Sequence, residues 1–257
     1  MKFGILGALK QEVEFILALM SNHSSVEHGG LTYYSGTLNQ HSVVLTCSGM
    51  GKVAAASAAT SLITYFHVDE VIVTGFAGGL SDKLNIGDIV ISNALYYHDM
   101  DAQPLYAKHE VPGTHLSSFH ADSLLVSTAS NVIQRFLNGL ESTVAPQLLE
   151  QLNFERAPQC HIGTIATGDQ FIQCKDQAQQ IIDARPDTLA LEMEGAAVAQ
   201  VCYNHKTPFI IIRIITDLAD QNAMRDFKTF IHTLAKTYSP HLVPAILSNT
   251  RAHATLN

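Results

Sequence analysis

The sequence predicts an α/β fold: a single three-layer domain in which helices flank a central mixed, twisted sheet. Short apolar runs of strand length alternate along the chain with segments of helical periodicity. Of the 257 residues, 47% are hydrophobic and only 15% are charged, which is typical of a compact globular chain. No linker or internal repeat divides the sequence. We therefore expect one domain over residues 1–248.

Strands are expected where short runs of apolar and β-branched residues occur. These runs are Lys2–Leu6, Leu31–Gly36, Ser42–Cys47, Val71–Thr74, Asp88–Ser92, Gly163–Ala166, Leu189–Glu192 and Phe209–Ile215. The sequence around Leu38, Asn39 and Gln40 predicts a hairpin between the second and third runs, with Gly36 and Asn39 as turn formers.

Helices are expected where the helical periodicity is sustained. They are Leu9–Asn22, Lys52–Phe66, Ala121–Leu137, Lys175–Asp183, Gly195–Asn204 and Phe227–Ser248. Several begin just after a turn that follows a strand, the edge at which open α/β sheets bind ligands. Residues 138–159 have weak periodicity and two prolines, which predicts a surface excursion, and residues 249–257 are expected to form a flexible polar tail.

The charge and composition exclude several classes of protein. The 15 Lys and Arg against 23 Asp and Glu give a net charge of -8, which disfavours nucleic-acid binding. No apolar stretch approaches the ~20 residues that a membrane span needs. The apolar run Phe3–Leu9 lacks a cleavage site, so we expect a cytoplasmic protein. Four scattered cysteines and 13 histidines without HxH or HxxxH spacing predict no metal site.

Two turns near predicted strand ends carry residues that suggest a ligand site. Glu12 lies in the first turn of a predicted helix, where an acidic residue also simply favours the helix dipole. The segment Thr74–Leu80 has three glycines in five positions, which leaves backbone N–H groups open to a ligand. A tight turn would explain the same glycines, and their spacing matches neither the dinucleotide nor the P-loop pattern.

Two predicted strands carry charges in apolar surroundings. Glu192 and Glu194 would point to the same side if their strand continues to Glu194. Arg213 interrupts a fully apolar strand, and a buried guanidinium needs an anionic partner, for which Glu12, Glu192 and Glu194 are candidates. Asp217 follows that strand, where it is either functional or the N-cap of a short helix.

Taken in order, these segments resemble the methylthioadenosine/S-adenosylhomocysteine nucleosidases of the purine nucleoside phosphorylase-like superfamily. The resemblance rests on GILGALKQEVE near the N-terminus, SGMGKVAAA from Ser48, TGFAGGL, GDIVIS from Gly87, YHDMD from Tyr97, TGDQFI from Thr167, LEMEGAAVAQVC and RIITDLAD from Arg213. It implies a nucleoside phosphorylase-like fold and cofactor-free, metal-free hydrolysis of the N-glycosidic bond of both nucleosides. It also implies a part in methionine salvage and a homodimer whose partner completes the 5′ pocket.

The resemblance assigns roles residue by residue. Asp217 would donate a proton toward adenine N7, Glu12 would activate water, and Arg213 would orient the acidic cluster, with Glu194 on the ribose hydroxyls. The remaining substrate-binding candidates are Phe171 and Ile172 at the adenine, Leu9, Met50, Met193 and Phe227 at the 5′-alkylthio group, and Phe76, Ala77, Gly78 and Thr216 around the ribose and the acid.

Water is favoured over phosphate as the nucleophile. No arginine precedes Arg135, and the carboxylate of Glu12 would repel phosphate. Phe76 stands where the family carries a serine, and Ala102 and Leu105 are smaller than the usual 5′-pocket residues. Three alternatives therefore stay open: a phosphorylase, a nucleosidase for another substrate such as a futalosine-type nucleoside, and a nucleoside-binding protein without catalysis.

Overall fold

The structure is a computed structural model that describes residues 1–140, 156–233 and 235–250. Ten strands pair into one mixed sheet, in the order β10-β6-β8-β9-β5-β1-β4-β3-β2, with β7 beside β6. They are β1 (Lys2–Gly7), β2 (Ser21–His28), β3 (Leu31–Leu38), β4 (His41–Cys47), β5 (Glu70–Gly79), β6 (Ile89–Tyr97), β7 (Phe119–His120), β8 (Cys160–Thr167), β9 (Thr188–Glu192) and β10 (Phe209–Asp217).

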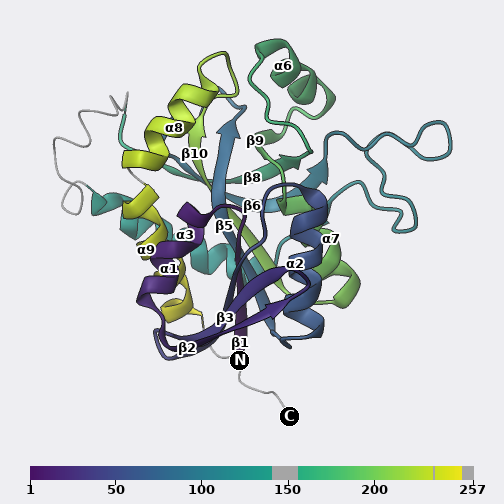
Figure 1. The fold of residues 1–257 in the computed structure, drawn as a ribbon. Coiled ribbons are helices and arrows are strands. Elements are labelled where there is room, and N and C mark those ends of the chain that lie inside the picture. Colours follow the sequence, from purple (N-terminus) through teal and green to yellow (C-terminus); the bar gives the residue numbers. More distant parts are fainter. Residues whose placement is uncertain (141–155, 234, 251–257) are drawn as a thin grey trace.

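Helices cover both faces of this sheet (Figure 1). They are α1 (Lys10–Leu19), α2 (Lys52–Thr64), α3 (Ser123–Asn138), α6 (Lys175–Ala184), α7 (Gly195–His205), α8 (Ala223–Thr233) and α9 (Ala235–Asn249). In Figure 1, α2 and α7 lie on one side, and α1, α3, α8 and α9 lie on the other. The predicted class, a mixed sheet between layers of helices, is confirmed.

Part of the sheet closes on itself. Every residue of β5 and of β10 is buried, as expected for strands covered on both faces. β10 pairs in parallel with β5 and antiparallel with β6, while β9 pairs antiparallel with β5 at Gly78 and Gly79. Strands β5, β10, β6, β8 and β9 therefore form a ring, from which β1, β4, β3 and β2 extend as an open sheet.

The predicted hairpin is confirmed, but one of its turn formers is wrong. Leu38 pairs with His41, and Asn39 and Gln40 between them have φ angles of 48° and 69°. Gly36 instead lies inside β3, where a Cβ would come within 2.8 Å of the Cβ of His23 on β2. Its missing side chain permits the close approach of the neighbouring strand.

Four element predictions need correction. The glycine-rich segment predicted as a turn continues β5 as far as Gly79. The first helix ends at Leu19, and the next residues form β2, a strand that was not predicted. β2 is a sheet edge with almost every residue exposed, so it lacks the alternation of apolar residues that marks a strand. The predicted helix Phe227–Ser248 is two helices, α8 and α9. The two-residue strand β7 is too short to leave a sequence pattern.

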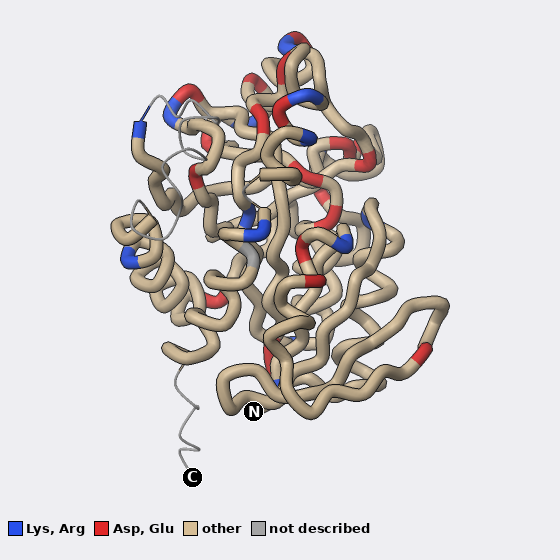
Figure 2. Tube along the Cα trace, turned by 60° about the vertical axis from the view of Figure 1, so that its left-hand side comes forward, with Lys and Arg blue, Asp and Glu red and all other residues tan. Residues whose placement is uncertain are grey.

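The domain boundaries stay a prediction. Residues 141–155 of the predicted excursion and residues 251–257 of the predicted tail lie outside the described residues. Among the residues described, no helix combines the length and apolar character needed to cross a membrane. Figure 2 shows that Lys, Arg, Asp and Glu concentrate in the half of the molecule away from the N-terminus.

Candidate active site

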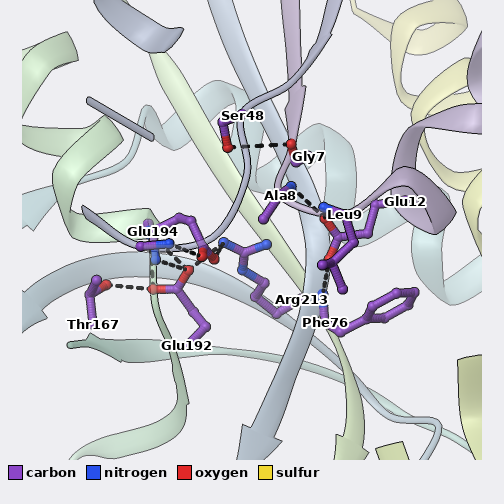
Figure 3. Close-up of polar contacts among 12 residues, drawn as sticks. Gly7, Ala8, Leu9, Glu12, Ser48, Phe76, Thr167, Glu192, Glu194 and Arg213 are labelled. Carbon is purple, nitrogen blue, oxygen red and sulfur yellow. Dashed lines mark hydrogen bonds and ion pairs between the residues drawn. The ribbon is translucent and has the colours of Figure 1, made fainter. Parts of the chain in front are cut away.

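The first turn of α1 places Glu12 inside the molecule. Its side-chain Oε2 accepts hydrogen bonds from the N–H groups of Ala8 (2.5 Å) and Leu9 (2.8 Å), and its Oε1 accepts one from Phe76 (3.1 Å; Figure 3). Gly75 permits this approach, because a Cβ there would lie 2.7 Å from Oε1. Burial raises the pKa of Glu12 above its usual value, although the Arg213 charge and the three N–H groups oppose the rise.

Arg213 is fully buried at the middle of β10 and faces the acidic residues. Its Nη2 forms an ion pair with Glu192 and lies 3.5 Å from Oε2 of Glu194. Of the three predicted partners, Glu192 is therefore the direct one, Glu194 is more distant, and Glu12 forms no ion pair with Arg213. Nη1 lies against Gly75, and neither Nη1 nor Nε has a hydrogen-bond partner among the described residues.

Glu192 and Glu194 meet at Arg213, but not for the predicted reason. β9 ends at Glu192, and Glu194 is the N-cap of α7, so the two do not alternate along one strand. Glu192 accepts hydrogen bonds from the Thr167 hydroxyl (2.5 Å) and the N–H of Gly195 (2.7 Å). Glu194 accepts one from the N–H of Gly51 (2.8 Å). Burial, together with the charge of Glu192, raises the pKa of Glu194.

Asp217 ends β10 and is 3% exposed. Its Oδ2 accepts a hydrogen bond from the Thr216 hydroxyl (3.0 Å), and its Oδ1 accepts one from the N–H of Ala219 (3.1 Å). No ion pair reaches Asp217 from the residues that the structure describes. Burial raises its pKa to about 6. The alternative interpretation as a helix N-cap is wrong, because α8 begins only at Ala223.

These side chains surround one cavity of about 330 Å³. Every predicted site residue except Arg213 lines it: Leu9, Glu12, Met50, Phe76, Ala77, Gly78, Phe171, Ile172, Met193, Glu194, Thr216, Asp217 and Phe227. Arg213 does not line it and packs against Gly75. The structure thus brings the predicted residues together, and their individual roles stay predictions.

The sequence argument missed some of the lining. Ala8, Gln170, Leu191 and Met224 line the cavity without having been predicted, and Glu192, which was considered only as a partner of Arg213, lines it too. Met224 lies one helical turn before Phe227 on α8, so helical spacing was a usable signal for it. Ala8 and Gln170 are chain neighbours of predicted residues, Leu191 directly precedes Glu192, and none of the three carried a signal of its own.

Phe76 does not fill the polar part of the site. Its ring packs edge-on against Phe227 and Phe230, at centroid distances of 6.3 and 6.1 Å, and points away from Arg213 (Figure 3). Phe171 continues this aromatic row, 6.0 Å from Phe227. Phe76, which stands where the family carries a serine, therefore donates its backbone N–H to Glu12 while its side chain packs in the core beneath α8.

The charge of the cavity wall is acidic. Glu12, Glu192, Glu194 and Asp217 line it, whereas no lysine or arginine of the described chain does. Within the described ranges, no group of three or more His, Cys, Asp or Glu side chains is arranged to hold a metal ion. The wall therefore offers carboxylates, backbone N–H groups and apolar surface to a ligand.

Comparisons with known proteins identify the family and the fold of the chain. The family profile described as "Phosphorylase superfamily" matches residues 2–247. A 5′-methylthioadenosine/S-adenosylhomocysteine nucleosidase of Oceanobacillus iheyensis is 38% identical over 92% of this chain and 94% of its own. The Neisseria meningitidis nucleosidase of the same name, solved with methylthio-immucillin-A, superposes with a TM-score of 0.85 at 34% identity, covering 97% and 99% of the two chains. Futalosine hydrolase of Helicobacter pylori gives 0.81 at 28% identity, covering 96% and 97%.

Proposed function

The chain belongs to the phosphorylase superfamily, and within it we propose that the chain hydrolyses the N-glycosidic bond of methylthioadenosine and S-adenosylhomocysteine and releases adenine. One observation carries the proposal. A single cavity presents Asp217, bound only by neutral donors, and Glu12, bound by three N–H groups, with no cation in the described wall. This is the pairing of a proton donor and a base that glycosidic hydrolysis requires.

The proposed reaction separates two proton transfers. Asp217 gives its proton to N7 of the leaving purine, the bond between the ribose and N9 breaks, and its electron pair leaves with the base. Glu12 takes a proton from the water that attacks the oxocarbenium-like ribose carbon. Burial raises the pKa of both carboxyls, so the two roles are separated by position and hydrogen bonding and not by opposite shifts.

Other residues bind and orient the nucleoside in this proposal. Glu194 accepts hydrogen bonds from the ribose hydroxyls, and Arg213 orients Glu192 and Glu194 from behind. The backbone of Ile172 binds the purine edge and Phe171 stacks on the ring. Apolar side chains hold the 5′-alkylthio group, namely Leu9, Met50, Met193 and Phe227, while Ala77 and Gly78 bring backbone close to the sugar.

A spectrophotometric assay of adenine release with and without phosphate tests the nucleophile. We expect equal rates, because no described lysine or arginine lines the cavity to bind phosphate. A strict dependence on phosphate would make the protein a phosphorylase and overturn the hydrolase proposal.

The futalosine hydrolase likeness supports a second candidate, a nucleosidase for another nucleoside. Side-by-side measurement of kcat/KM for methylthioadenosine, S-adenosylhomocysteine and futalosine decides between them. We expect the thioether nucleosides to be preferred, since the relatives at 36–38% identity carry that name. A preference for futalosine would reassign the substrate.

Loss of catalysis is the third possibility, and it was raised by Phe76. Because the ring packs in the core, Phe76→Ser is expected to lower stability by about 3 kcal/mol without increasing turnover of methylthioadenosine. Higher turnover in the variant would mean that Phe76 impairs the native site. Tight binding of methylthioadenosine to the native protein without turnover would identify a binding protein.

We also propose a homodimer, a cytoplasmic location and a part in methionine salvage, all on the strength of family membership. Met50, just before α2, and Val53, in its first turn, are 64% and 83% exposed, which leaves apolar surface beside the cavity for a partner to cover. Light scattering after size-exclusion chromatography is expected to give twice the 27.9 kDa chain mass. A monomeric mass would contradict the dimer.

A further inference from the structure

Three charged side chains, Lys52, Asp99 and Asp169, form a network that we call the clasp. The Lys52 ammonium Nζ lies 2.7 Å from Oδ2 of Asp99 and 3.5 Å from Oδ2 of Asp169. Asp99 Oδ2 also accepts a hydrogen bond from the Asp169 N–H at 3.1 Å. None of the three lines the cavity. Burial would raise the pKa of Asp99, but its bonds to Lys52 and Asp169 hold that pKa below the usual value.

The clasp also holds the start of α2. Asp169 Oδ1 accepts a hydrogen bond from the N–H of Lys52 (2.9 Å), the first residue of the helix. The preceding N–H, that of Gly51, is bound by Glu194 from inside the cavity (2.8 Å). Two carboxylates from different segments thus bind neighbouring N–H groups at the positive end of α2.

The residues next to the clasp are cavity wall. Met50 lines the cavity and is two residues before Lys52, and Gln170, Phe171 and Ile172 directly follow Asp169. Residues 168–172 contain the groups proposed to bind the base, and Gly51 in residues 49–52 donates a hydrogen bond to Glu194, the proposed ribose ligand. Movement of Asp169 relative to Lys52 would therefore separate these two segments. The hydrogen-bond partners of Glu12 and Asp217 all lie outside the clasp, so the proposed bond-breaking groups are held independently of it.

We propose that Lys52 and Asp169 are positioning residues that fix the distance between residues 49–52 and residues 168–172 and so set the affinity for the nucleoside. The catalytic part of this inference rests on the proposed function. The clasp acts through Phe171, Ile172 and Glu194 and touches no reacting atom. Because Lys52 and Asp99 keep 24% and 25% of their side chains exposed, salt screens the clasp only in part.

Kinetics of the variants Lys52→Met and Asp169→Ala test the inference. We expect each to raise KM for methylthioadenosine about tenfold while kcat stays within about twofold, as for a lost ground-state contact. The double variant is expected to raise KM by less than the product of the two single effects, because both variants remove the Lys52–Asp169 ion pair while only Asp169→Ala also removes the hydrogen bond to the Lys52 N–H. Lys52→Arg, which keeps the charge, is expected to retain most of the affinity, and Asp82→Asn is the matched control for losing an exposed carboxylate.

Two kinetic outcomes would overturn the proposal. One is an unchanged KM in both single variants. The other is a double variant whose effect equals the product of the two single effects, because independent contributions would mean that the residues do not act as one contact.

Amide hydrogen exchange of the ligand-free protein tests the clasp without any substrate. We expect faster exchange at residues 49–53 and 168–173 in both variants than in the wild type, and unchanged exchange in α7. Wild-type exchange rates in both segments would contradict the clasp whatever the substrate is. Faster exchange in a protein that does not hydrolyse methylthioadenosine would leave the clasp intact and refute the proposed function.

Discussion

Two buried aspartates at β10, Asp88 and Asp217, differ in their surroundings: Asp88 forms an ion pair with Arg156, whereas Asp217, within the described chain, accepts hydrogen bonds only from neutral groups. Asp88 is connected to this strand by its carbonyl, which accepts a hydrogen bond from the N–H of Ile215 at 2.8 Å, and Asp217 ends the same strand. Asp217 accepts two hydrogen bonds from neutral groups and faces the cavity. Asp88 does not line this cavity and is completely buried.

Asp88 has a partner for each lone-pair direction. Arg156 donates two hydrogen bonds, at 2.9 and 2.6 Å, the N–H groups of Asn85 and Gln159 donate at 2.9 and 2.7 Å, and His161 Nε2 lies at 3.2 Å. Burial alone would raise the pKa of Asp88, but these partners hold it below its usual value. A buried carboxylate with all its partners stabilises the fold, whereas one with unfilled positions toward a cavity can exchange a proton with a ligand.

Replacing Asp217 is expected to give the largest effect on activity. Asp217→Asn keeps the shape and deletes the proposed proton donor, so turnover should fall by about 10³-fold. Adenine release measures the loss, and a cooperative thermal transition checks that the variant is folded. Near-normal kcat would refute the assigned role.

The same substitution at Asp88 is expected to affect stability and not turnover. Asp88→Asn leaves Arg156 without its anion and should lower the free energy of unfolding by about 3 kcal/mol, measured in urea. The control Asp122→Asn, at the N-cap of α3, should change it by under about 0.5 kcal/mol because asparagine caps equally well. If Asp88→Asn abolished adenine release in folded protein, the separation of the two aspartates would fail.

The two aspartates should give stability opposite dependences on pH. The folded pKa of Asp217, about 6, lies above its ordinary value of 3.8, so its contribution is full below about pH 4 and is lost as pH rises through 6. Asp88 has a lowered pKa, so its contribution is present above pH 3.8 and is lost as pH falls through the folded value.

Urea titrations from pH 3 to 8 test this. At pH 7, Asp217→Asn is expected to be more stable than the wild type by up to about 3 kcal/mol, with the difference vanishing near pH 4. A variant less stable than the wild type at pH 7 would contradict the raised pKa.

The smallest effect is expected at Thr216. The hydroxyl of Thr216 bonds the charged form of Asp217, so Thr216→Val should raise the Asp217 pKa by about half a unit. In the wild type we expect kcat/KM to fall above about pH 6 as Asp217 loses its proton, and the variant should shift that limb upward. A downward shift would show that the hydroxyl does not stabilise the carboxylate.

The Arg213 cluster could be predicted from the sequence, whereas the Asp88 cluster could not. Arg213 was identifiable because an arginine in an apolar strand is unusual, and its need for an anion led to the acidic residues now found beside it. The Asp88 cluster was not identifiable, because Arg156 and His161 come from a distant segment with no pattern linking them to Asp88.

Which residues form the site was more predictable from the sequence than how each of them is placed. The spacing argument for Glu192 and Glu194 was wrong because the strand ends between them, even though both reach Arg213. The clasp residues Lys52 and Asp169 lie in motifs that carry the resemblance, but no pattern linked them to each other, since they become neighbours only when the start of α2 meets the loop after β8. The apolar strand β10 was located closely, the second half of β5 was interpreted as a turn because of its glycines, and the exposed strand β2 was missed.

Gly75 and Arg213 are paired across β5 and β10, and the guanidinium occupies the space that any larger residue at position 75 would need. The residues at positions 75 and 213 therefore constrain each other: the arginine requires a glycine opposite it. A lineage that replaced the glycine would first have to give up the arginine, and with it the partner of Glu192.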